Sequence, residues 1–282
     1  IAMTPPTGPV FLSLPGDVLL DEAGIDLGGV TRVDTATRPS DAAIESLAAR
    51  LLAAKNPAII AGNEIVTSDA LAEVGLFAET LGAASYQHTV AYGAHFPSES
   101  PAYMGQLSRE QKAIRDKLDP YDVLLFIGAD VLRTSVASPI EPMPPHATVI
   151  QIGLNDWEMG KNYTTEVALR ADVRETLRTL IPVLKEKGGA ALKETAAKRL
   201  AALTDDNWSA RREKVLDRAR SQSGATPIAP DWLIHNVVDA LPDNSIIVNE
   251  ALTSARALQQ IRPYRDRFDY HGNASGGIGF GL

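Results

Sequence analysis

Short, uninterrupted apolar runs separated by amphipathic segments dominate the middle of the chain. The clearest runs lie at residues 57–62, 122–128, 148–152 and 167–169, with a weaker one at 84–87. A strand of a parallel sheet gives such a run because helices cover both faces of the sheet. The alternation therefore predicts an α/β fold: a doubly wound parallel sheet in an α/β/α middle domain of the NAD/FAD-binding type.

Helix boundaries delimit this domain. Ser40 precedes apolar residues spaced three and four apart, Ile44, Leu47, Ala48, Leu51 and Leu52, so one apolar stripe faces a sheet. Residues 68–81 predict a second helix before the weaker strand. Asp172 stands three residues before Glu175, which is the pattern of a capping box at a helix start. We place the middle domain at residues 39–184.

The remaining sequence divides into flanking segments. Residues 185–226 are Ala-rich and charged, with interspersed signs, which predicts a solvated helical connector. Residues 227–282 begin a further domain, with a helix from Pro230 and a strand near 245–250. Residues 8–14 have the pattern of a late strand, so we assign residues 1–20 to the end of another domain and 21–38 to a linker. Both flanking α/β domains are expected to be incomplete.

Composition favours small-molecule chemistry. The formal charge of −8 disfavours a nucleic-acid partner, because such proteins gather Lys and Arg against phosphates. The absence of cysteine excludes disulfides, Cys-ligated zinc and a thiol nucleophile, and fits a cytoplasmic protein. No apolar run approaches the roughly 20 residues that span a bilayer, so no membrane partner is expected.

Three stretches, in order, are similar to the thiamine diphosphate-dependent enzyme superfamily, which includes benzoylformate decarboxylase, pyruvate decarboxylase and acetolactate synthase. They are residues 8–18, the pair 56–62 and 121–133, and the pair 248–254 and 273–282. The Asn249-Glu250 pair and the Ala-Ser-Gly-Gly-Ile-Gly-Phe run at 274–280 resemble the benzoylformate decarboxylase branch.

The resemblance implies a domain order and an activity. Residues 1–20 would end a pyrimidine-binding domain, and residues 227–282 would form the N-terminal part of a diphosphate-binding domain. The whole enzyme would be a 2-oxo acid decarboxylase or carboligase, a lyase that binds thiamine diphosphate and Mg²⁺ and assembles as a homodimer or homotetramer. The chain is then expected to be a fragment that is inactive alone.

The same resemblance implies roles for four residues. Ile278 would support the bent cofactor, and the Gly276 carbonyl would accept a hydrogen bond from its amino group. Thr253 and Ser254 would hold the diphosphate. Without the resemblance, residues 275–281 suit a tight strand-to-helix turn, and Thr253 or Ser254 suits a helix cap.

The family's activating glutamate and its magnesium ligands would lie outside this chain. We therefore assign no catalytic residue and no metal ligand here, and Glu250 is not taken as the activating carboxylate.

Three histidines are further candidates. His88 and His95 flank a loop after the weaker strand, and His271 precedes the glycine-rich run. Histidine exchanges protons near neutral pH, although a surface or helix-end role is more common. Benzoylformate decarboxylase has a proton-transferring histidine at the place that Thr134 and Ser135 occupy here, and a serine cannot replace an imidazole in that work.

Two other functions stay open. An acetolactate synthase-like enzyme would bind FAD, but the glycine triplet that those enzymes carry after the first middle-domain strand is replaced here by Gly62-Asn63-Glu64. The other is a non-catalytic dinucleotide-binding module. The chain has no Gly-x-Gly-x-x-Gly run after its first strand, which disfavours this function.

Overall fold

The computed structural model describes residues 2, 8–26, 28–29, 34, 36–251, 253–273 and 279. The chain divides into two compact units, residues 1–37 and 38–282. In the first unit the described residues are exposed, and Val18–Leu20 form a short 3-10 helix, η1. The prediction of a strand at residues 8–14 is wrong, since these residues adopt no strand. A strand needs a neighbouring edge for its backbone N–H and C=O groups, and the described part of this unit supplies none.

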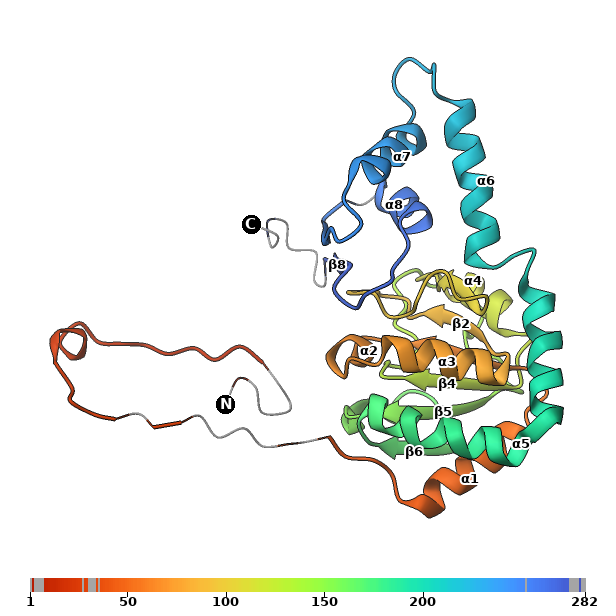
Figure 1. Cartoon of the computed structure of the whole chain (residues 1–282), viewed down its shortest axis with the longest axis horizontal. Helices are drawn as coiled ribbons and strands as arrows, with labels where there is room; N and C mark the ends of the chain where they lie inside the picture. The colour runs from red at the N-terminus through yellow and green to blue at the C-terminus, as the bar shows by residue number, and fades with distance from the viewer. Residues whose placement is uncertain are drawn as a thin grey trace. The chain divides into compact units, whose positions relative to one another are not determined.

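The second unit is built around a six-stranded parallel sheet (Figure 1). Its strands are β1 Pro57–Ala61, β2 Ala84–Gln87, β3 Tyr103–Gln106, β4 Val123–Ile127, β5 Thr148–Gly153 and β6 Val167–Arg170. The order is β3-β2-β1-β4-β5-β6, and each neighbouring pair is parallel. The doubly wound parallel sheet is confirmed. Strand β3 was not predicted from the sequence. Its residues, Tyr-Met-Gly-Gln, include a glycine and a polar residue, which interrupt the apolar pattern.

Helices cover both faces of this sheet. They are α1 Asp41–Leu52, α2 Glu64–Thr67, α3 Leu71–Leu81, α4 Gln111–Leu118 and α5 Val173–Leu203, with a short 3-10 helix, η2, at Asp156–Glu158. The helix starts predicted at Ser40 and Asp172 are confirmed. The Ser40 hydroxyl accepts a hydrogen bond from the Ala43 N–H at 3.3 Å, and the Asp172 carboxylate accepts one from the Glu175 N–H at 2.9 Å. Each bond satisfies an N–H that the first helical turn leaves free.

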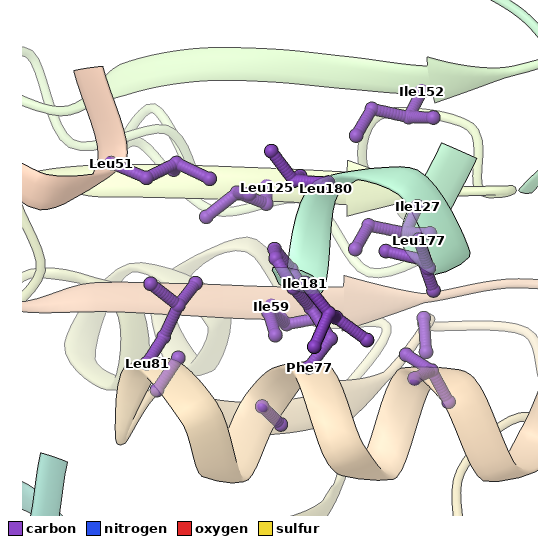
Figure 2. Close-up of a cluster of buried hydrophobic side chains, with 14 of the residues drawn as sticks. Leu51, Ile59, Phe77, Leu81, Leu125, Ile127, Ile152, Leu177, Leu180 and Ile181 are labelled. Carbon is purple, nitrogen blue, oxygen red and sulfur yellow. The ribbon is translucent and has the colours of Figure 1, made fainter. Parts of the chain in front are cut away.

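Alternate residues of β1, β4 and β5 enter two separate cores. On one face, β1 contributes Ile59 and β4 contributes Leu125 and Ile127, which pack against α1, α3 and α5. Figure 2 shows these side chains meeting Phe77 and Leu81 of α3 and several leucines and isoleucines of the neighbouring helices. On the other face, residues such as Ile60 and Phe126 pack against α4. The period of two in strand side chains produces this division.

The connector after the sheet is helical but not wholly solvated. Helix α5 contains a break at Gly189, and α6 follows at Trp208–Ser221. Helix α6 buries four residues spaced along one face, Trp208, Val215, Leu216 and Ala219. Val215 and Leu216 pack with Ile261, so this face is fixed against the segment that follows. The prediction of a solvated connector is therefore wrong for α6.

The C-terminal part contains α7 Pro230–Ala240, β7 Ile247–Asn249, α8 Ala255–Ile261 and β8 Tyr270–Gly272. Strands β7 and β8 pair in parallel, and α7 and α8 lie side by side (Figure 1). The predicted helix start at Pro230 and the predicted strand near 245–250 are confirmed. In the described part of the chain, no helix combines the length and apolarity needed to cross a membrane.

Candidate functional site

A cavity of about 1070 Å³ lies at the carboxyl ends of β2 and β3. Its walls come from residues 89–92 and 103–109, from 133–135, from the start of α6, and from residues 249–251, 256–260 and 270–273 in part. Two backbone contacts join these segments: the Gly272 N–H donates to the Tyr92 carbonyl at 2.8 Å, and Gly93 forms an antiparallel bridge with His271. Because parallel strands end at one edge, the loops of the sheet and the C-terminal part meet there.

The cavity wall is strongly cationic. Among the described residues that line it, six are basic, Arg109, Lys117, Arg133, Arg211, Arg212 and Arg256, and one is acidic, Glu250. Burial lowers the pKa of Lys117, and Arg211 adds to this effect. Thr89 is also fully buried on the wall, and its hydroxyl has no hydrogen-bond partner among the described residues. This lining is suited to a polar, anionic ligand.

Helix α6 joins the sheet to the C-terminal part at this cavity. The Trp208 indole N–H donates to the Gln259 carbonyl at 3.0 Å, and Arg212 Nε donates to the Ile261 carbonyl at 2.8 Å. Arg211 donates to the carbonyl of Met104, which lies within β3. Sequence reasoning missed these three residues. Their spacing of three and four places them on one helix face, a signal that the interspersed charges of the segment obscured.

Asn249 organises the turn that follows β7. Its side-chain amide donates to the Tyr270 hydroxyl at 2.8 Å, and its side-chain oxygen accepts from the Ala251 N–H at 3.1 Å. Gln259 Nε2 also donates to the Tyr270 hydroxyl, at 3.0 Å. Tyr270 is almost fully buried, so these bonds hold residues 249–251 at the cavity wall.

Two of the four predicted cofactor residues fall within the described structure. Thr253 is exposed, and Ser254 is the half-buried N-cap residue of α8, whose side chain makes no capping hydrogen bond. Neither lines the cavity as described, although their neighbours Ala251 and Arg256 do. Gly276 and Ile278 lie outside the described residues. Gly279 donates its N–H to Glu250 Oε2 at 2.7 Å, so Gly279 lies beside the residue that follows β7.

His88 and His95 are buried rather than exposed. His88 Nδ1 accepts from the Val90 N–H at 3.3 Å, and His95 Nε2 accepts from the Gly93 N–H at 3.2 Å. Burial lowers the pKa of His88 to about 4 and that of His95 to about 3. Both rings are therefore neutral near pH 7 and hold the loop that forms one cavity wall. They are unsuited to proton transfer there, because such work needs a pKa near the working pH.

Thr134 and Ser135 stand at the place that the resemblance gives to a proton-transferring histidine, and they lie at the cavity. Thr134 and Ser135 line it next to Arg133, whose guanidinium donates to the Tyr92 hydroxyl at 3.3 Å. His271 is a half-buried residue of β8 and pairs through its backbone with Gly93. The structure thus brings Thr134 and Ser135 to the site.

Comparison with known proteins shows what the domain around the six-stranded sheet is similar to. Residues 44–180 match the family model of the thiamine pyrophosphate enzyme central domain. Over these residues the chain is similar to the central domain of the thiamine diphosphate-dependent enzymes. Over its whole length the chain is 28% identical to benzoylformate decarboxylase of Pseudomonas aeruginosa, of which it covers 50%. It is 29% identical, over 66% of its length, to the acetolactate synthase large subunit of Corynebacterium glutamicum, of which it covers 30%.

Solved structures agree with this fold. The crystal structure of benzoylformate decarboxylase from Polynucleobacter necessarius aligns with 99% of the chain at a TM-score of 0.77 and 22% identity, and 48% of that protein is covered. The chain thus spans about half the length of the relatives that it matches over its whole length. Among the residues that the structure describes, no group of three or more His, Asp or Glu side chains is placed to hold a metal ion.

Proposed function

We propose that the chain is part of a thiamine diphosphate-dependent 2-oxo acid decarboxylase or carboligase of the benzoylformate decarboxylase kind. One observation carries this proposal: the central domain and the segment at residues 249–273 share the walls of one cationic cavity. A diphosphate is an anion, and such a lining attracts it. Similarity to benzoylformate decarboxylase along the full chain supports the branch.

The chain's own residues would bind and orient the cofactor. We assign Thr253 and Ser254 to the diphosphate, with the exposed cation of Arg256 in the first turn of α8. The Gly276 carbonyl and the Ile278 side chain are proposed to set the cofactor's bent shape. When bound, thiamine diphosphate supplies an electron sink for the bond that breaks beside a 2-oxo group. Thr134 and Ser135, which line the cavity, would face the substrate.

The metal and the assembly belong to the same proposal. Mg²⁺ would bind with the diphosphate through ligands other than the described residues of this chain, and the enzyme would be a homodimer or homotetramer. The substrate would be a small 2-oxo acid. The gene product that contains this sequence should therefore release carbon dioxide from benzoylformate or pyruvate when supplied with thiamine diphosphate and Mg²⁺. If it neither turns over these acids nor binds the cofactor by calorimetry, the proposal fails.

Substitution Ser254→Ala in that gene product tests the diphosphate assignment. Loss of a hydrogen bond to a charged group costs about 1.5 to 3 kcal/mol, so the Kd for thiamine diphosphate should rise by roughly 10- to 100-fold. Ser223→Ala is the matched control, because Ser223 is an exposed serine in the loop before α7. Isothermal titration of both variants gives the comparison. Equal affinity in the two would remove Ser254 from the site.

A further inference from the structure

The sheet has a second place where a ligand would ordinarily bind. Strand order reverses between β1 and β4, since the chain runs outward from β1 through β2 to β3 and from β4 through β5 to β6. In open α/β sheets, ligands bind in the crevice beyond the carboxyl ends of the strands at such a reversal, with anionic groups against backbone N–H groups. Here this crevice is bounded by the residues that follow β1, β4 and β5.

Glu64 occupies this crevice. Its Oε2 accepts a hydrogen bond from the Leu154 N–H at 2.6 Å, and its Oε1 accepts one from the Asn155 N–H at 3.2 Å. These two N–H groups follow β5, where an anionic ligand would find them. The Glu64 N–H itself donates to the Gly128 carbonyl at 3.1 Å, which fixes the residue between β1 and β4.

Glycines at the ends of three strands leave room for this side chain and little else. A Cβ atom on Gly153 would lie 2.9 Å from Glu64 Oε2, and one on Gly128 would lie 2.5 Å from Glu64 Cβ. A Cβ on Gly62 would lie 2.4 Å from the Gly128 carbonyl oxygen. The crevice is thus closely packed around Glu64, and a phosphate could not enter while the carboxylate remains.

The charges around Glu64 limit what else the crevice can hold. Burial raises the pKa of Glu64, Asp130 and Asp172 act in the same direction, and the two N–H groups oppose them. The Leu154 and Asn155 N–H groups are therefore what favours an anion here, and the two other carboxylates would repel a second one.

We infer that Glu64 is an internal substitute for the phosphate of a nucleotide cofactor, and that it excludes nucleotides from the crevice between β1, β4 and β5. Removal of the side chain should then uncover a site for small anions, formed by the Leu154 and Asn155 N–H groups. This inference concerns a different place from the cationic cavity, and it holds or fails independently of the thiamine proposal.

Chemical rescue of Glu64→Ala tests the inference. Sodium acetate should raise the melting temperature of this variant in a saturable way, relative to sodium chloride at equal ionic strength. At ten times the Kd for acetate, the unfolding equilibrium should shift by about 11-fold. Wild type and Glu110→Ala, which removes an exposed glutamate that makes no capping hydrogen bond, should show no such rise. A folded Glu64→Ala that responds to acetate no more than these controls would overturn the inference.

Two further measurements complete the test. If Glu64→Ala is recovered only unfolded, its refolding yield in acetate and in chloride is compared; recovery specific to acetate supports the inference, and equal yields overturn it. ADP is then titrated into the wild-type chain by calorimetry. Saturable binding that survives substitution of the cavity residue Arg211→Ala and shifts the amide signals of Leu154 and Asn155 would show that the crevice is open, contrary to the inference.

Discussion

Lowering the pH from 6.5 to about 4 is expected to destabilise the second unit steeply because of His88 and His95. An unfolded histidine titrates near 6.5, whereas burial lowers the pKa of His88 to about 4 and that of His95 to about 3. In this window the unfolded chain binds protons that the folded chain does not. The free energy of unfolding should therefore fall by about 1.4 kcal/mol per pH unit for each histidine. The contribution of the two neutral histidines to stability is fully present above pH 6.5 and is lost as the pH decreases toward their folded-state pKa values.

Urea denaturation at several pH values measures this effect. Carboxylates also contribute to acid sensitivity, so the comparison is made with variants. His95→Gln should reduce the slope between pH 6.5 and 4 by about 1.4 kcal/mol per pH unit. The exposed His146 supplies the control, and His146→Gln should keep most of the wild-type slope. If His95→Gln and wild type have the same slope, the ring of His95 is not buried in its neutral form.

Truncation of Phe77 should cause the second large loss. This side chain is fully buried between α3, the sheet and α5, as Figure 2 shows. Phe77→Ala removes most of an aromatic ring and leaves a cavity that the packed neighbours cannot fill, so it should cost about 3 to 5 kcal/mol of unfolding free energy. Urea denaturation at pH 7 is the measurement.

Leu76→Ala is the matched control for this helix. Leu76 is adjacent in sequence but 47% exposed, so its truncation should cost far less. Both variants replace a large apolar residue of α3 with alanine at adjacent positions. The main difference between them is how deeply the original side chain is buried. Costs within about 1 kcal/mol of each other would contradict the packing described for this core.

Sequence analysis recovered the sheet well because its strands carry their own signal. Strand β4, Val-Leu-Leu-Phe-Ile, is buried at every residue, so covering both faces leaves no room for polar alternation. The caps at Ser40 and Asp172 were likewise readable, since each side chain accepts a hydrogen bond from an N–H three residues on, which is a local signal of a helix start. Strand β3 and helix α4 were not predicted, because β3 is short and contains a glycine, and α4 buries two apolar residues, Ile114 and Leu118, within eight.

The site was less accessible to prediction. Thr253 and Ser254 were chosen by resemblance, and their role stays a prediction. Trp208, Arg211 and Arg212 reach the cavity because α6 packs against α8, a contact between residues some 50 positions apart in the chain. Local spacing shows that they share a helix face but does not reveal which surface that face meets.

By itself the sequence determined the fold class, the order of most elements and the resemblance to thiamine diphosphate-dependent enzymes, because apolar period and capping are properties of neighbouring residues. Only the tertiary structure decided that His88 and His95 are buried and neutral, and that Glu64 fills the crevice beside β1. Burial and hydrogen bonding of a polar side chain depend on segments that are distant in sequence, such as Leu154 and Asn155 for Glu64. Those contacts form only when the strands assemble in their order. The strand order decides which side chains and N–H groups meet at the carboxyl ends of the strands.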